Sequence, residues 1–303
     1  MKNEGEHGGA SSLTAALARV LAEGAIAVLA TVVEAPGDAN RVGAKLLVEE
    51  NGARTGGTGD AALDQLIARH APVFLASRAE ARTHTVEELS AENKSASESD
   101  PATGSQLVTG SELTVWEGVR VLFERVEPEP HVVVCGAGHV GAALARLAHA
   151  VGYRVTLVDD RADFVTRARF PEEGIVLVAA ESWSESLLEV LGTGRGVSVA
   201  VVTRGHNEDE GCMRAVLQVR ADYIGMIGSR RRTNIVLERL RETGVDESHL
   251  REVRAPVGLD IGAVTPEEVA LSILAEIVAA RRGGTCAPLS GFRREREKGK
   301  RQK

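Results

Sequence analysis

Residues 131–161 read HVVVCGAGHVGAALARLAHAVGYRVTLVDDR, and this stretch decides the fold of the second half of the chain. A short apolar run meets a glycine-rich turn, a helix follows, and a second apolar run ends in two aspartates. The glycines Gly136, Gly138 and Gly141 form the pattern G-x-G-x-x-G between the first run and the helix. This order of elements is that of a βαβ unit that binds the phosphate of a nucleotide.

Each part of such a unit has a physical role. The first glycine permits a tight turn, the second lets a phosphate approach the backbone, and the third lets the helix pack closely on the strand. The helix N-terminus offers N–H groups and a partial positive charge to an anion. Asp159-Asp160 end the second strand at about the distance where an acid of such a unit binds a ribose hydroxyl. His139 lies inside the loop, where it either contacts the ligand or caps the turn. The alternative is the same scaffold with its site empty or used otherwise.

Two more polar segments, TRGHNEDEG and GMIGSRRR, follow apolar runs that read as strands. The carboxyl ends of parallel strands meet at one edge of a sheet, and ligands bind there. We therefore expect Arg204, His206 and Arg230 to contact an anionic ligand. A basic run at the positive end of a helix is unfavourable unless an anion compensates it, although a solvent-exposed helix start is the alternative. Asp209 either has a role at this site or only caps the next helix, and the residues alone leave both open.

The remaining patterns divide the chain. Strands alternate with helices after residue 131, which predicts a parallel sheet with helices on both faces. In the first half we expect a helix over 12–23, a buried strand over 25–35, a hairpin turn at Asn51-Gly52, a helix over 58–71 and a strand over 73–77. The fold class is α/β, in four parts: a smaller N-terminal α/β domain over 10–87, a linker or mobile insertion over 88–112, a Rossmann-type C-terminal domain over 113–284 and a basic tail over 285–303.

Composition excludes several classes of protein. The chain has 303 residues, a net charge of −7 and no body-wide basic pattern, so nucleic acid is not expected as a partner. No signal-peptide pattern and no apolar run of membrane-spanning length occurs, so we expect a cytoplasmic protein that does not bind membranes. The three cysteines have no metal-ligand spacing, and no cysteine or histidine cluster along the sequence suggests zinc, so no metal site is expected.

The motifs CGAGHVG, VTLVDDR, TRGH-x-x-D, IGMIGSRR and PVGLDIGAVTPEEVALSILAEIVAARRG occur in this order over residues 131–284. In that order they resemble the XdhC/CoxI family, the accessory factors of xanthine dehydrogenase and related molybdenum hydroxylases. The stretch VLATVVEAPGDANRVGAKLLV resembles the family's N-terminal module, with Arg41 at the matching basic position.

The resemblance implies a carrier. Family members are understood to bind the molybdenum cofactor (molybdopterin), assist its sulfuration and deliver it to an apo-hydroxylase, and self-association is expected. The glycine loop would hold the phosphate, Asp159 and Arg161 a ribose or the pterin edge, and Arg41 would reach in from the first domain. One departure concerns sulfur: Asp60-Ala61-Ala62 stands where the family often has Gly-Gly-Cys, so a thiol is missing there.

Two other functions remain open from the residues alone. The glycine loop together with Asp159 also fits an NAD(P)-dependent oxidoreductase, although no hydride-transfer constellation is recognisable in the sequence. A protein that senses a nucleotide without turning it over is the third possibility. The identity of the bound ligand separates the three functions.

Overall fold

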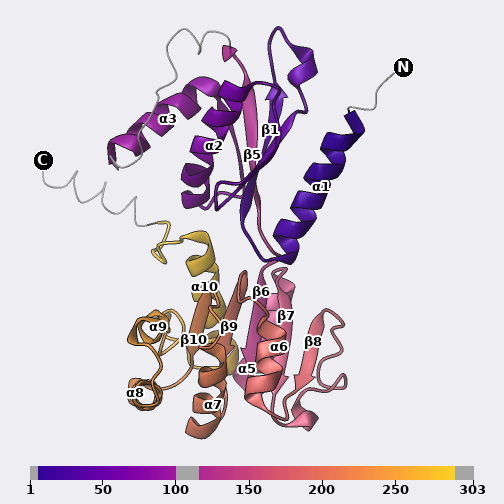
Figure 1. Cartoon of the computed structure of the whole chain (residues 1–303). Coiled ribbons are helices and arrows are strands. Elements are labelled where there is room, and N and C mark those ends of the chain that lie inside the picture. The colour runs from indigo at the N-terminus through magenta and orange to yellow at the C-terminus, as the bar shows by residue number, and fades with distance from the viewer. Residues whose placement is uncertain (1–5, 100–115, 291–303) are drawn as a thin grey trace, which may run out of the picture. The chain divides into compact units, whose positions relative to one another are not determined.

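A computed structural model of the chain describes residues 6–99 and 116–290, apart from the side chains of residues 6–11, 93–99, 206 and 207. The chain divides into two compact units, Met1–Pro128 and Glu129–Lys303. Figure 1 shows the elements of each unit along the chain. Within the described residues, no helix is both long enough and apolar enough to span a bilayer.

The first unit is built on a five-stranded antiparallel sheet in the order β3-β2-β1-β5-β4. Its strands are β1 (Ala27–Glu34), β2 (Lys45–Glu49), β3 (Arg54–Gly57), β4 (Ala81–Thr85) and β5 (Arg120–Val126). Its helices are α1 (Glu6–Ala22), the short η1 (Ala39–Arg41), α2 (Ala61–Ala76) and α3 (Val86–Ser99).

Alternation along β1 assigns its side chains to the two faces of the sheet. Val28 and Ala30 join the main core with α2 and α3, whereas Ala27 joins a smaller cluster with residues of α1. The hairpin between β2 and β3 turns at Asn51-Gly52 as predicted, and Gly52 has a φ of +85° there. The first unit is thus a sheet covered on both faces.

Two elements of this unit differ from the sequence-based predictions. Residues 73–77 were expected to form a strand, but α2 continues to Ala76 because Leu66, Ile67 and Phe74 keep the helical spacing of its buried face. Residues 88–99 were expected in a linker, but they belong to α3. Thr85 and Glu88 begin that helix with a reciprocal cap, since each side chain bonds the other's backbone N–H, at 3.3 and 2.9 Å. Residues 100–112 of the predicted linker lie outside the described residues.

Strand β5 also changes the predicted domain boundary. We expected residues 113–126 to open the second domain, but β5 pairs with both β1 and β4 in the middle of the first sheet. Without it, the two inner edges of that sheet would lack their hydrogen-bonding partner. The boundary between the units therefore lies after Pro128.

The second unit has the predicted Rossmann-type architecture. Its five parallel strands take the order β10-β9-β6-β7-β8. They are β6 (His131–Cys135), β7 (Arg154–Asp159), β8 (Ile175–Ala179), β9 (Val197–Val201) and β10 (Tyr223–Met226). The order reverses direction between β6 and β9, and this switch point is where such sheets leave a crevice at their carboxyl edge.

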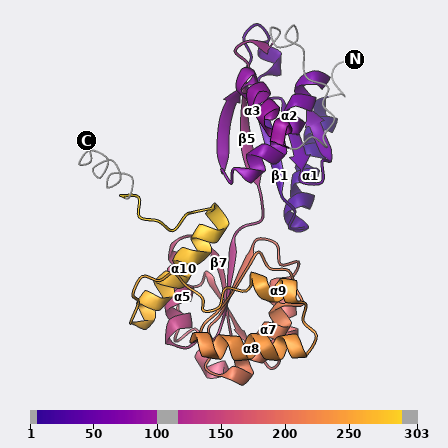
Figure 2. The ribbon, with the colours of Figure 1, turned by 90° about the vertical axis from the view of Figure 1, so that its left-hand side faces the viewer.

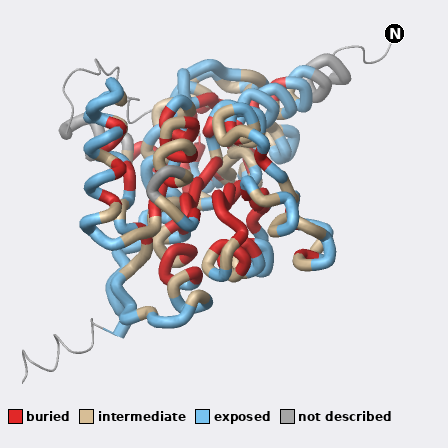
Figure 3. Tube along the Cα trace, turned by 90° about the horizontal axis from the view of Figure 1, so that it is seen from below, coloured by how far each residue is buried: buried red, intermediate tan, exposed pale blue. Residues whose placement is uncertain are grey.

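Helices cover both faces of this sheet (Figure 2). One core packs α5 (His139–Ala150) and α10 (Pro266–Arg282) on one face. The other core packs α6 (Trp183–Leu191), α7 (His206–Val216), α8 (Arg230–Glu242) and α9 (Glu247–Glu252) on the opposite face. Every residue of β6, β9 and β10 is buried. Figure 3 colours the buried residues of the chain red. The predicted capping box of Thr265 and Glu268 begins α10.

Candidate functional site

The glycine loop between β6 and α5 has the geometry that its sequence predicts. Gly136 has a φ of +112°, and a Cβ there would lie 2.7 Å from the carbonyl oxygen of Val202. A Cβ on Gly141 would lie 1.8 Å from the carbonyl oxygen of Gly136. The first glycine therefore serves the turn and the third serves close packing.

Gly138 has a different role, because a Cβ at this position would meet nothing within 4 Å. It is the N-cap of α5, with a φ of −69° and a ψ of −169° that other residues also adopt. The first turn of α5 contains no acidic residue, and its N-cap, a glycine, has no side chain with which to cap it. Open space above Gly138 thus faces the N-terminal end of a helix, which is a favourable place for an anion.

Asp159 ends β7 beneath this loop and is 1% exposed. Its carboxylate accepts from the backbone N–H of Ala137 at 2.6 Å, and from the backbone and the side chain of Arg161 at 2.8–2.9 Å. Burial raises the pKa of Asp159, but the bonds from Arg161 and Ala137 outweigh it and hold that pKa below its ordinary value. The carboxylate is ionised, and it fixes the glycine loop to the end of β7.

Charged side chains extend this network between the ends of β7 and β9. Arg204 donates two parallel bonds to the carboxylate of Asp160, at 3.0 and 3.1 Å, and lies 3.3 Å from Glu208. The Arg161 guanidinium lies over the ring of Phe164, 3.5 Å from its centroid. Arg204 is about half exposed. Replacing its ion pair with Asp160 by a contact to another anion therefore costs little free energy.

A cavity of about 350 Å³ opens at this edge of the sheet. Its walls come from the ends of β6, β7, β9 and β10 and from the starts of the helices that follow them. They comprise Gly136, Gly138, His139, Val140, Asp159, Asp160, Arg161, Trp183, Val202, Thr203, Arg204, Glu208, Ile227, Gly228, Arg232 and Pro266.

Sequence reasoning predicted part of this wall. Six of the ten predicted contacts line the cavity: Gly136, Gly138, His139, Asp159, Arg161 and Arg204. Gly141 is buried behind the loop and supports it. His206 is the first residue of α7, and its side chain is outside the described part of the structure. Arg230 is the exposed first residue of α8 and does not line the cavity. The roles predicted for these ten residues as cofactor contacts stay predictions.

Sequence reasoning missed Arg232. The Nε of Arg232 donates to the buried carboxylate of Asp209 at 2.8 Å, and Thr203 donates to the same carboxylate. Asp209 lies inside α7, whose N-cap is Gly205, and it holds a cavity arginine in place. The run of three arginines was visible in the sequence, but only the helical phase of α8 shows which of them turns inward.

Arg41 lies in the first unit, on η1. Its guanidinium donates to Asp38 at 2.9 Å and to Asp60 at 3.1 Å. Asp60 opens the stretch Asp60-Ala61-Ala62 and caps α2, accepting from the N–H groups of Ala62 and Leu63 at 3.0 and 3.2 Å. Burial raises the pKa of Asp60, but these hydrogen bonds outweigh it and lower that pKa. Asp60 is thus a charged N-cap of α2 that also binds Arg41.

Comparison with known proteins follows the same division into two units. A family model described as the XdhC Rossmann domain matches residues 132–277, and a second, described as the XdhC and CoxI family, matches residues 20–87. Among curated proteins, the chain is 28% identical over 253 residues to the uncharacterized protein YqeB of Escherichia coli K12, covering 84% of this chain and 43% of YqeB.

Two other relatives have descriptive names. A probable xanthine dehydrogenase subunit from Bacillus subtilis 168 is 32% identical over 162 residues, which are 54% of this chain and 46% of that protein. The molybdenum cofactor insertion chaperone PaoD of Escherichia coli K12 is 27% identical over 111 residues, 35% of each chain. The chain thus spans less than half the length of each of these relatives. With both family models matched in order, one on each unit, the chain belongs to the XdhC and CoxI family.

Proposed function

We propose that this chain binds the molybdenum cofactor and delivers it to a xanthine dehydrogenase-type molybdenum hydroxylase. The observation that carries the proposal is the open space over Gly138 at the uncapped start of α5, in a chain whose relatives include a molybdenum cofactor insertion chaperone. Molybdopterin carries a phosphate, and this loop offers the N–H groups and the partial charge that a phosphate needs.

The rest of the cavity fits an extended anionic ligand. Gly136 and Gly138 would hold the phosphate, while Arg161 and Arg204 would contact the pterin edge or a nucleotide if one is attached. Arg232, held by Asp209, adds a further cation to the wall. His139 would lie beside the ligand, and His206 stays a predicted contact from the start of α7. The cofactor supplies the redox chemistry of the hydroxylase that receives it, and the residues of this chain bind and shield it.

Sulfuration is not part of the proposal. Cys135 and Cys212 are both fully buried, and burial raises the pKa of Cys212 well above its ordinary value. Neither thiol is among the residues that line the cavity. Cys286 is exposed after the end of α10 and does not line the cavity. We propose that the cofactor is held without a thiolate ligand from these three cysteines.

The oxidoreductase alternative gains little from the geometry. In dinucleotide-binding proteins, the acid at the end of the second strand accepts from the ribose hydroxyls. Here Asp159 already accepts four hydrogen bonds, and a carboxylate offers about four lone-pair positions. A ribose would have to displace Arg161 from this carboxylate. The geometry therefore favours a role for Asp159 in shaping the glycine loop.

Delivery is tested by reconstitution. The chain is purified from a host that makes the cofactor, and it is mixed with a xanthine dehydrogenase-type apo-enzyme from a host that cannot make it. We expect hydroxylase activity to appear with the wild type and to fall at least tenfold with Gly138→Val. The valine fits the backbone at this position, but its side chain fills the space that the phosphate would occupy.

A matched control adds the same side chain at the other end of the same helix. Ala150→Val lies at the exposed end of α5 and should reconstitute the apo-enzyme as the wild type does. Equal activity with Gly138→Val and with the wild type would overturn the assignment of the glycine loop as the cofactor site.

A further inference from the structure

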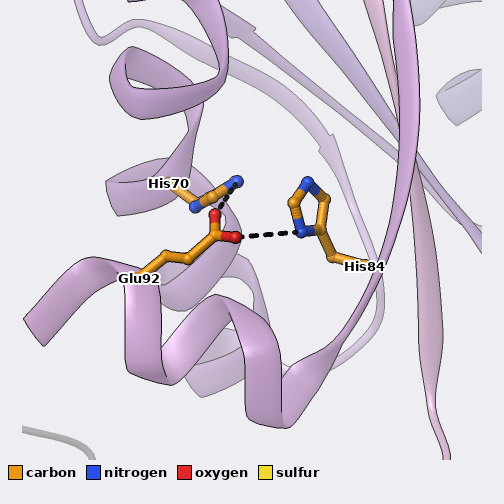
Figure 4. Close-up of side chains that lie close together, drawn as sticks. All are labelled: His70, His84 and Glu92. Atoms are coloured by element: carbon orange, nitrogen blue, oxygen red, sulfur yellow. Dashed lines mark ion pairs between the residues drawn. The ribbon is translucent and has the colours of Figure 1, made fainter. Parts of the chain in front are cut away.

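His70, His84 and Glu92 converge in the first unit from three different elements, α2, β4 and α3 (Figure 4). The Nε2 of His70 lies 3.6 Å from one carboxylate oxygen of Glu92, and the Nδ1 of His84 lies 3.9 Å from the other. The centroids of the two imidazole rings are 4.7 Å apart. One ligand atom from each residue can be chosen so that all three lie within 4.8 Å of one another.

The two imidazoles belong to the core of the unit. His70 is 1% exposed and His84 is 4% exposed, and the ring of Phe123 packs edge-on against both of them. The Nε2 of His84 is buried and makes no hydrogen bond to any residue that the structure describes. An imidazole gives one nitrogen to one ion, so this Nε2 is distinct from the Nδ1 that faces Glu92, and the site described below rests on Nδ1.

The donor set is that of a transition-metal site. Imidazole nitrogens and one carboxylate are common ligands of Zn²⁺, and three protein ligands leave a fourth position for water. Two ligand atoms of a tetrahedral zinc ion lie about 3.3 Å apart, since each bond is about 2.0–2.1 Å long. The two separations from Glu92, 3.6 and 3.9 Å, exceed this by about 0.3 and 0.6 Å, and the three chosen ligand atoms all lie within 4.8 Å of one another, so the set has to contract around an ion. The Glu92 side chain is 42% exposed, so it is free to move towards the two imidazoles when an ion binds. Its exposure also lets an ion reach the site from solvent.

We infer that His70, His84 and Glu92 form a binding site for a divalent transition metal, with zinc as the expected ion. The site would tie α3 to α2 and β4. That helix buries few large apolar side chains in its described part, chiefly Val86 and Leu89, so a metal clamp would contribute much of its attachment. The inference stands apart from the proposed cofactor cavity, which lies wholly in the second unit.

No sequence pattern predicts this site, and no metal was expected. The three ligands are separated by fourteen and by eight positions, and no pair has the spacing of two ligands on one helical face or in one tight turn. Only the packing of three elements around Phe123 brings them together.

Binding is tested on the full chain after removal of metal with a chelator. Zn²⁺ is titrated by calorimetry, and Co²⁺ replaces it as a spectroscopic probe of tetrahedral ligation. We expect saturation near one ion per chain, intense visible Co²⁺ absorption, and a rise of a few degrees in the Tm when Zn²⁺ is added. Absence of saturable binding of either ion would overturn the inference.

Two variants identify the ligands, and a third serves as the control. Glu92→Gln keeps the size of a partly exposed side chain, so it should fold normally while weakening Zn²⁺ at least 100-fold, and His84→Gln should do the same. His131→Gln removes another buried imidazole, in the second unit, and should leave the affinity unchanged. Unchanged affinity in folded Glu92→Gln would show that the bound ion lies elsewhere, which would also overturn the assignment.

Discussion

The three glycines of the loop between β6 and α5 tolerate a methyl group to very different degrees. A Cβ on Gly141 would overlap the carbonyl oxygen of Gly136, whereas a Cβ on Gly138 meets open space. We expect Gly141→Ala to lower the free energy of unfolding by roughly 2–3 kcal/mol, because α5 and β6 cannot move apart to make room for the methyl group without loosening the core. Gly138→Ala should change it by less than about 0.5 kcal/mol. Urea denaturation of both variants checks the contrast, and equal losses would contradict it.

These glycine roles could be predicted from the sequence, because G-x-G-x-x-G after a strand constrains the backbone locally. The partners of the charged residues could not. Asp159 lines the cavity, but no pattern in the sequence shows that Arg161, only two positions later, binds its carboxylate. Arg232 enters the wall through Asp209, which lies in another helix. Pairings of this kind depend on how the helices pack, and a linear pattern does not contain that information.

At the scale of elements, one buried histidine links two neighbouring strands. His131 of β6 faces Thr156 of β7, with 2.9 Å between Nε2 and Oγ1, and Arg154 donates to its Nδ1 at 2.9 Å. Nδ1 therefore accepts, and the ring is neutral with its proton on Nε2. Burial, and then the charge of Arg154, lower the pKa of His131 to about 4.

This shift predicts a pH dependence of stability. Between pH 6.5 and 4 the unfolded state binds a proton at His131 that the folded state does not, so the free energy of unfolding falls as the pH falls through this window. The loss approaches about 3 kcal/mol at pH 4. Urea denaturation across this window should show a shallower pH dependence for His131→Gln than for the wild type. An NMR titration that finds the imidazole protonated near pH 6.5 would refute the prediction.

Elements with strong local signals could be predicted, and those that depend on distant pairing could not. The capping box at Thr265 and the turn at Gly52 follow from a few adjacent residues, and both are confirmed. Strand β5 was assigned to the wrong unit because its neighbours, β1 and β4, come about ninety and forty residues earlier in the chain. The start of α3 had a usable signal, Thr85 with Glu88, beneath a composition that resembles a linker.

At the scale of the whole molecule, the two units have separate cores and separate candidate sites. The second unit carries the cavity for an anionic cofactor, and the first carries the proposed metal site. Self-association and transient binding to an apo-hydroxylase stay predictions for the whole chain. The family motifs made the overall assignment possible from the sequence, since they are long and occur in a fixed order on the chain.

The central claim is that the cavity of the second unit binds the molybdenum cofactor, and the identity of the released ligand tests it most directly. The chain is purified from a molybdenum-replete host and denatured, and the released ligand is examined by mass spectrometry and by the fluorescence of its oxidised pterin. We predict a molybdopterin product approaching one per chain. Release of NAD(H) or NADP(H) with no pterin would contradict the claim and favour an oxidoreductase.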